Sequence, residues 1–96
     1  MTDLWWLSFA DPDLPKGRQF LGVAIVPGDD MISAVRNAHA LGCNPGGEIK
    51  GTNLPKSYAA HVPETAVARL LDRAEITQLH LHMAETLGKT YPPDLH

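Results

Sequence analysis

The sequence predicts an α+β fold in which helices pack on a small mixed sheet of three strands, with the elements in the order β-β-α-β-α-α. Three short runs are apolar or rich in β-branched and aromatic residues, as strands usually are, and they cover residues 4–9, 19–26 and 48–54. The stretches after the second and third runs instead repeat apolar residues at intervals of three or four, which is typical of helices that cover a sheet. Together these patterns favour one sheet layer with helices against it.

Length and composition indicate a single folded domain over residues 1–96. Of the 96 residues, 44% are hydrophobic and 20% are charged, which is enough for one core and excludes the disordered class. We expect a ββαβ core over residues 1–54, C-terminal helices over 62–88 and an extended tail over 89–96. The net charge of −3 gives no general attraction to nucleic acid or to an anionic membrane.

The sequence also predicts a cytoplasmic protein. No apolar run approaches the roughly 20 residues of a membrane span. The N-terminus has Asp3 and no Lys or Arg before Leu4, so a secretory signal is not indicated. The single cysteine, Cys43, excludes an intrachain disulfide and suits a reducing compartment, where we expect it to be a packed thiol.

The first predicted strand, Leu4–Phe9, is apolar on both faces. Alternation of side chains puts Leu4, Trp6 and Ser8 on one face and Trp5, Leu7 and Phe9 on the other. A strand of this kind needs cover on both sides. Because the chain is small, we expect a second subunit to supply part of that cover, which makes the protein a homo-oligomer.

A loop at Asp11–Arg18 separates the first two strands and carries two cations, Lys16 and Arg18. It is longer than the about two to five residues that a hairpin needs. It is either a solvated loop or a flap that closes on an anionic ligand. The next run, Gln19–Val26, is nearly continuous in apolar residues and is predicted to be the central strand, antiparallel to the first.

A helix is predicted between the second and third strands, starting at Asp29 or Asp30 and ending at Gly42. An aspartate can cap the free N–H groups at its start, and a glycine allows the left-handed conformation at its end. The apolar face predicted for this helix consists of Ile32, Val35, Ala38 or His39, and Gly42, widened by Ala34 and Leu41. A right-handed crossover through the helix makes the third strand parallel to the second.

The stretch Asn44–Gly47 predicts a type II turn, because proline suits the second position and Gly46 supplies a positive φ at the third. We therefore expect Gly46→Val to damage folding more than Gly17→Val. Consecutive N–H groups of such a turn can form a small anion-binding concavity. In the predicted topology this turn and the 11–18 loop meet at the same edge of the sheet.

Two helices are predicted in the C-terminal part. Pro63 and Glu64 suit the first turn of one of them. Its predicted buried stripe is Val67, Leu70 and Leu71. The spacing of Asp72 and Glu75 matches a capping box and predicts that a second helix starts there. The predicted apolar face of that helix is Ile76, Leu79, Met83 and Leu87. Gly88 is expected to end it.

The sequence contains no motif for catalysis or for metal binding. His80 and His82 are two residues apart, so on a helix they diverge by about 200° and cannot chelate one ion together. No Cys/His set has zinc-like spacing, and no nucleophile elbow, Walker loop or zinc-protease helix is present. We expect no metal, no cofactor and no enzymatic activity.

Three segments carry a resemblance to known proteins: Trp6–Asp11, Lys16–Gly22 and Asn44–Glu48, which read WLSFAD, KGRQFLG and NPGGE. This set is similar to that of small uncharacterised proteins of bacteriophages and bacteria, over residues 4–54. The resemblance implies a phage or prophage setting, hence the host cytoplasm, and it implies no activity. Small phage proteins include anti-defence sponges that sequester nucleotide-derived immune signals, and this chain is similar to them in size and in lacking catalytic groups.

Two functions follow as expectations. The first is non-enzymatic binding of a small molecule, as a sponge for a nucleotide. Its expected ligand-binding residues are Trp6, Lys16, Arg18, Asn44, Gly46 and Gly47. The tryptophan offers a stacking surface, and the cations and turn N–H groups offer donors to phosphate. The alternative is a protein-binding inhibitor or structural accessory protein that acts through an apolar oligomer or partner surface.

Overall fold

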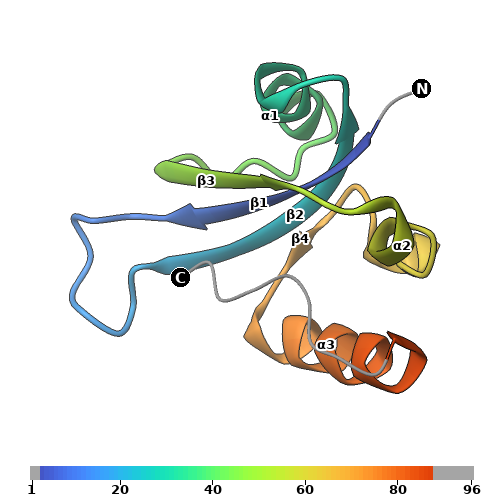
Figure 1. Cartoon of the computed structure of the whole chain (residues 1–96). Coiled ribbons are helices and arrows are strands. Elements are labelled where there is room, and N and C mark those ends of the chain that lie inside the picture. Colours follow the sequence, from blue (N-terminus) through green and yellow to red (C-terminus); the bar gives the residue numbers. More distant parts are fainter. Residues whose placement is uncertain (1–2, 88–96) are drawn as a thin grey trace.

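The computed structural model describes residues 3–87, which form a four-stranded sheet with helices on both faces (Figure 1). In chain order the elements are β1 (Asp3–Ala10), β2 (Phe20–Gly28), α1 (Met31–Ala40), β3 (Glu48–Asn53), α2 (Lys56–Ala59), the 3-10 helix η1 (Glu64–Ala66), β4 (Leu70–Leu71) and α3 (Arg73–Leu87). The predicted α+β class is confirmed. The predictions for Gly88 and for the tail at 89–96 concern residues outside the described part of the chain.

The strands are ordered β3-β1-β2-β4, and each pair of neighbours is antiparallel. β1 and β2 pair over their whole lengths, from Asp3 opposite Gly28 to Ala10 opposite Phe20. β2 and β3 run in the same direction, as predicted, but β1 lies between them, so they are not neighbours. The sheet therefore has four strands with antiparallel neighbours, where the sequence predicts three strands in a mixed sheet.

Each face of the sheet carries its own hydrophobic core. The α3-side core lies between the sheet and α2 and α3, and its buried members include Trp6, Val23, Ile25, Tyr58, Leu79 and Met83. The α1-side core lies between the sheet and α1, and its buried members include Leu7, Phe9, Ala24, Val26, Ala34 and Ala38. The predicted alternation along β1 is thus confirmed. Since the helices of this chain cover both faces (Figure 1), β1 does not by itself require a second subunit, and the homo-oligomer stays a prediction.

Both ends of α1 agree with the predicted capping. The Asp30 side chain accepts a hydrogen bond from the Ser33 N–H at 2.8 Å. At the other end Gly42 has a φ of 77°, and its N–H and that of Cys43 donate to the carbonyls of His39 and Ala38. These two bonds form a Schellman motif, which satisfies carbonyls that the helix leaves without partners.

The predicted apolar face of α1 is confirmed for Ala34, Val35 and Ala38 and is wrong for Ile32 and Leu41. Ile32 is 66% exposed and Leu41 is exposed too, whereas Ala34 and Ala38 are completely buried. The helix lies so close to β2 that a Cβ on Gly28 would come within 2.6 Å of the Ala34 backbone nitrogen. Small residues are favoured at this position because they permit the close approach of the helix and the strand. The packing gained in this way outweighs the larger apolar area that isoleucine would bury.

The predicted helix starting at 62–64 is wrong beyond its first turn. Only Glu64–Ala66 is helical, as η1, and the chain then pairs with the edge of β2 through β4. Leu70 and Leu71 lie opposite Ala24 and Val23. Their spacing fits a helix, but the unpaired backbone of the β2 edge offers hydrogen bonds that a second short helix would leave unmade. Residues 56–59, between β3 and η1, form the short helix α2.

The predicted start of α3 is confirmed. The Glu75 N–H donates to the Asp72 carboxylate at 2.9 Å, and the Asp72 N–H donates back to Glu75 Oε1 at 3.3 Å. This reciprocal pair is a capping box with aspartate at the cap position. From the predicted apolar face Leu79 and Met83 are buried and Ile76 is partly buried against the α3-side core. The side chain of Leu87 lies outside the described part of the structure.

Candidate functional site

The structure brings the two predicted ligand-binding segments to the same end of the sheet, as expected. Ala10, the last residue of β1, lies opposite Phe20 of β2 and opposite Glu48 of β3. The 11–18 loop therefore starts beside the point where the 44–47 turn enters β3 (Figure 1). The two segments nevertheless do not share one hollow. A hollow of about 210 Å³ beside the loop is lined by Ala10, Gly17, Gln19, Phe20 and Arg73, so Lys16 and Arg18 only flank it.

The turn residues adopt the predicted positive φ at Gly46, which is 88°, and Gly47 has a positive φ of 80° as well. The Gly46 N–H donates to the side chain of Asn44 at 2.8 Å, so the turn satisfies this donor itself. Gly47 packs on the carbonyl of Ala10, where a Cβ would overlap the oxygen. These contacts give the glycines a structural role at the entrance to β3.

Trp6, the predicted stacking residue, lies inside the α3-side core and is only 3% exposed. Its indole stacks on the imidazole of His80, with ring centroids 5.8 Å apart and planes within 10°. Burial lowers the pKa of His80 from its ordinary value of 6.5. Trp6 Nε1 and His80 Nε2 are both buried without a hydrogen-bond partner among residues 3–87. A ligand therefore has no access to the Trp6 ring in this conformation.

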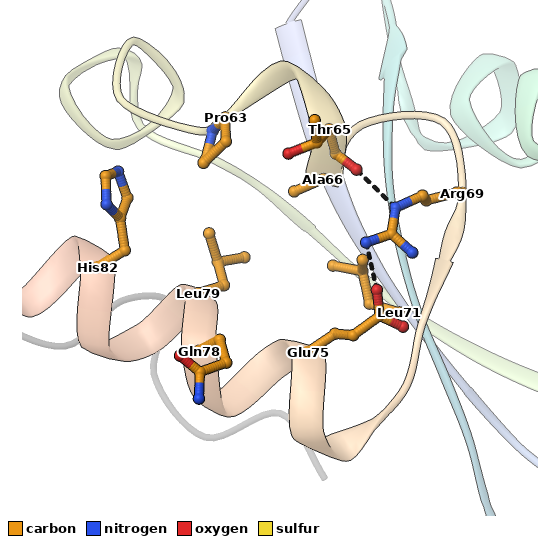
Figure 2. A pocket seen from close by; sticks show the side chains of 9 residues that line it. All are labelled: Pro63, Thr65, Ala66, Arg69, Leu71, Glu75, Gln78, Leu79 and His82. Carbon is orange, nitrogen blue, oxygen red and sulfur yellow. Dashed lines mark hydrogen bonds and ion pairs between the residues drawn. The ribbon is translucent and has the colours of Figure 1, made fainter.

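A groove of about 310 Å³ lies between α3 and the segment that precedes β4 (Figure 2). One wall is formed by α3, with the side chains of Glu75, Gln78, Leu79 and His82. The other wall is formed by Pro63, Thr65, Ala66 and Arg69, with Leu71 between the walls. This volume lies at the lower end of the range of small-molecule sites, which is about 300–1,000 Å³.

The α3 wall follows directly from helical spacing. Glu75, Gln78, Leu79 and His82 stand at positions i, i+3, i+4 and i+7, which share one face of a helix. Figure 2 shows them in that order along α3, from Glu75 opposite Arg69 to His82 at the far end. Leu79 is buried and forms apolar floor, while Gln78 and His82 are exposed at the rim.

Arg69 dominates the opposite wall, and two contacts hold its guanidinium. Nε donates to the carbonyl of Thr65 at 2.5 Å, and a terminal nitrogen forms an ion pair with Glu75 on α3 (Figure 2). The second Glu75 oxygen is the one that accepts from the backbone of Asp72. The capping box of α3 and the arginine of the groove are therefore fixed by the same carboxylate.

The backbone immediately before Arg69 has an unusual conformation. Ala68 has a φ of 64°, and its N–H donates to the carbonyl of Ile25 at 2.9 Å. Val67 on one side of it forms an isolated parallel bridge with Ile25, and Leu70 on the other side pairs antiparallel with β2. Ala68 thus reverses the chain at the sheet edge. A left-handed alanine costs about 1–2 kcal/mol, and such residues are concentrated at functional sites.

The groove combines an apolar floor with a polar rim. Ala66, Leu71 and Leu79 are all buried and supply the floor. Arg69, Glu75, Gln78 and His82 supply charged and hydrogen-bonding groups around it. This distribution is typical of ligand pockets, in which apolar contacts give affinity and a few polar groups give orientation.

Sequence reasoning missed the groove because one wall lies in the segment that it assigned to a helix. The α3 wall could have been found from the i, i+3, i+4, i+7 spacing of residues 75–82. No local signal in the sequence places Thr65 and Arg69 opposite that face, because the pairing of β4 with β2 brings them there.

Comparison of the chain with protein-family models, with curated proteins and with solved structures finds no match. Within residues 3–87, no group of three or more His, Cys, Asp or Glu side chains is placed to hold a metal ion. None of the helices described over the same residues combines the length and the apolar character that crossing a membrane requires.

Cys43 is buried, and its burial raises the pKa of the thiol above its ordinary value.

Proposed function

We propose that this protein binds a small molecule without chemical turnover, and that the groove between α3 and residues 63–69 is its ligand site. The observation that carries the proposal is the joint presence of an apolar floor and an anchored arginine in a hollow of about 310 Å³. Two other surface features within residues 3–87 lack this combination. The hollow beside the 11–18 loop is smaller, at about 210 Å³, and the 44–47 turn satisfies its own donor.

The arrangement of the polar groups supports binding and not catalysis. Arg69 and Glu75 are paired with each other, so the carboxylate of Glu75 is engaged before a ligand arrives. In Figure 2 the His82 imidazole lies at the far end of the groove from Arg69. Chemical steps need an acid, base or nucleophile converging on one reacting atom, whereas orientation of a ligand needs only separate contacts.

In the phage setting implied by the resemblance, sequestration of a nucleotide-derived immune signal is the biological role proposed for this site. This proposal keeps the expected sponge function, but it places the ligand site in the groove instead of at Lys16, Arg18 and the 44–47 turn. Those residues then have a structural role or are solvated. The protein-binding alternative gains no specific support, because the large exposed apolar side chains among the described residues are scattered over several elements: Leu14, Ile32, Leu41 and Leu81.

The experiment that tests the proposal combines discovery of a ligand with its location. Protein purified from cells with an activated defence system is examined by native mass spectrometry for a bound small molecule. Purified protein is also titrated calorimetrically with cyclic nucleotides, mononucleotides, ADP-ribose derivatives and neutral aromatic amides. We expect at least one ligand to bind, with its affinity lost in Gln78→Trp, which fills the groove, and kept in Arg18→Ala. Loss of binding in Arg18→Ala alone would place the ligand at the loop and contradict the proposal.

A further inference from the structure

We infer that the groove recognises a monoanion, whose acidic group pairs with the Arg69 guanidinium while its apolar body lies on the floor. This inference rests on the proposed function, since it names the class of ligand for the same site. It concerns carboxylates and singly charged phosphate esters alike, because both present two oxygens in the geometry that a guanidinium matches.

The first reason is the balance of donors and acceptors. A guanidinium has five N–H donors. Within residues 3–87, Arg69 Nε bonds the Thr65 carbonyl and Nη2 pairs with Glu75, which leaves the other terminal nitrogen, Nη1, without a protein partner. The carboxylate of Glu75 has a contact at each of its two oxygens. Arg69 therefore retains N–H donors that the acidic group of a ligand can use.

The second reason is charge. The charged side chains that line the groove are Arg69 and Glu75, and their charges cancel. One negative charge on the ligand can pair with the Nη1 end of Arg69. A second negative charge would meet no further arginine or lysine in the lining and would approach the Glu75 carboxylate. A groove of this composition therefore selects one charge over two.

The third reason is preorganisation. The Thr65 carbonyl and Glu75 hold the guanidinium from two sides, and Ala68 fixes the backbone turn from which Arg69 projects. A long side chain that is already ordered loses less conformational entropy when a ligand arrives, so more of the contact energy appears as affinity. Glu75 and Thr65 are thus positioning residues for Arg69.

The apolar floor of the groove indicates the chemical character of the ligand apart from its acidic group. Ala66, Leu71 and Leu79 present buried aliphatic surface to the groove, which suits a ring or a short branched chain. At about 310 Å³ the space suits a small ligand, such as an aromatic acid or a cyclic mononucleotide. Benzoate is therefore the minimal probe, and benzamide is its neutral counterpart of the same shape.

The test is a titration of ¹⁵N-labelled full-length protein with benzamide, benzoate and phthalate, which carry zero, one and two negative charges. Cyclic AMP and 5′-AMP form a second pair that distinguishes a phosphate ester from a carboxylate. We expect benzoate to shift the amides of residues 65–71 and 75–82 and the Arg69 Nε–H signal. Benzamide should bind at least about tenfold more weakly, and phthalate no more tightly than benzoate. Cyclic AMP should bind more tightly than 5′-AMP if the natural acid is a phosphate.

The variants separate a direct contact from a general effect of charge. Arg69→Gln should weaken benzoate binding about tenfold or more, whereas Arg73→Gln should leave it unchanged, because Arg73 lies over the Phe20 ring and outside this groove. Equal binding of benzoate and benzamide, equal binding by Arg69→Gln and wild type, or no benzoate shift at 50 mM would each overturn the inference. If neutral compounds bind and Gln78→Trp blocks them, the ligand class is wrong and the proposed function stands. If nothing binds at the groove, both fail.

Discussion

The imidazole of His80 stacks on the indole of Trp6, with nearly parallel planes and ring centroids 5.8 Å apart. This contact joins α3 to the centre of β1 and removes the tryptophan from the surface. His80 Nε2 is buried and has no hydrogen-bond partner among the described residues. A protonated imidazole would thus carry a charge into a site that offers its Nε2 atom no acceptor there.

The first prediction is that stability decreases in mild acid because of His80. Burial lowers the pKa of His80 below 6.5, so the unfolded chain binds this proton more readily than the folded one. The contribution of His80 to stability is therefore complete above about pH 6.5 and declines as the pH falls through that value towards the folded-state pKa. Thermal unfolding of wild type and His80→Phe between pH 8 and pH 5 measures the effect. The phenylalanine retains the stack and should show a shallower loss of melting temperature.

His82→Phe is the matched control, because it lies at an exposed position of the same helix. It should keep the part of the acid dependence that His80 causes. Parallel pH profiles of wild type and His80→Phe would show that the stacked histidine does not control the acid response.

The second prediction concerns the entrance to β3. Gly47→Ala should destabilise the protein by roughly 1–3 kcal/mol more than Gly46→Ala, because its new Cβ overlaps the Ala10 carbonyl oxygen while the space around Gly46 is open. Denaturant unfolding with both variants gives the difference in the free energy of unfolding. Similar midpoints and slopes for the two would mean that the 44–47 turn moves away from Ala10 at no cost.

The structure alters the predicted comparison between Gly46→Val and Gly17→Val. Both glycines have a φ of 88° and open space around them, so Gly46→Val and Gly17→Val should cost similar amounts. The difference expected from the type II turn alone is not supported, because the 11–18 loop also contains a left-handed glycine.

The third prediction uses the strained backbone beside Arg69. Ala68→Gly should raise the free energy of unfolding by up to about 1 kcal/mol, since relief of the positive φ exceeds the entropy that glycine adds to the unfolded chain. Ala68→Val should lower it, because a β-branched residue is poorly tolerated at this φ. Chemical denaturation of the two variants provides the comparison. A destabilised Ala68→Gly together with a neutral Ala68→Val would exclude a left-handed residue at this position.

Much of the fold could be predicted because its signals are local. The caps at Asp30, Gly42 and Asp72 depend on residues within one turn of the chain, and each contact has the expected partner. The two-faced pattern of Leu4–Phe9 correctly predicts cores on both sides of the sheet. The same pattern does not predict what covers them, because cover depends on where distant helices pack.

The predictions that are wrong depend on contacts between residues that are far apart in the sequence. The apolar spacing of Val67, Leu70 and Leu71 fits a helix, yet a strand of two residues forms because the β2 edge is available. Gly22 on β2 lacks the Cβ that would otherwise come within 2.8 Å of the Leu71 carbonyl oxygen, so it permits this pairing. The candidate site depends on the same event, since β4 brings Arg69 opposite α3. Local patterns therefore locate only the α3 wall of the groove.

The most direct test of the central claim is to map a bound ligand on the ¹H–¹⁵N spectrum of wild type, Gln78→Trp and Leu81→Trp. Gln78 lines the groove, whereas Leu81 is an exposed residue of the same helix outside it, so the two variants add the same side chain at contrasting places. A ligand from the calorimetric screen should shift the amides of residues 65–71 and 75–82 in wild type and in Leu81→Trp, and none of them in Gln78→Trp. Shifts confined to residues 11–18 and 44–47, unchanged in Gln78→Trp, would contradict the claim that this groove is the ligand site.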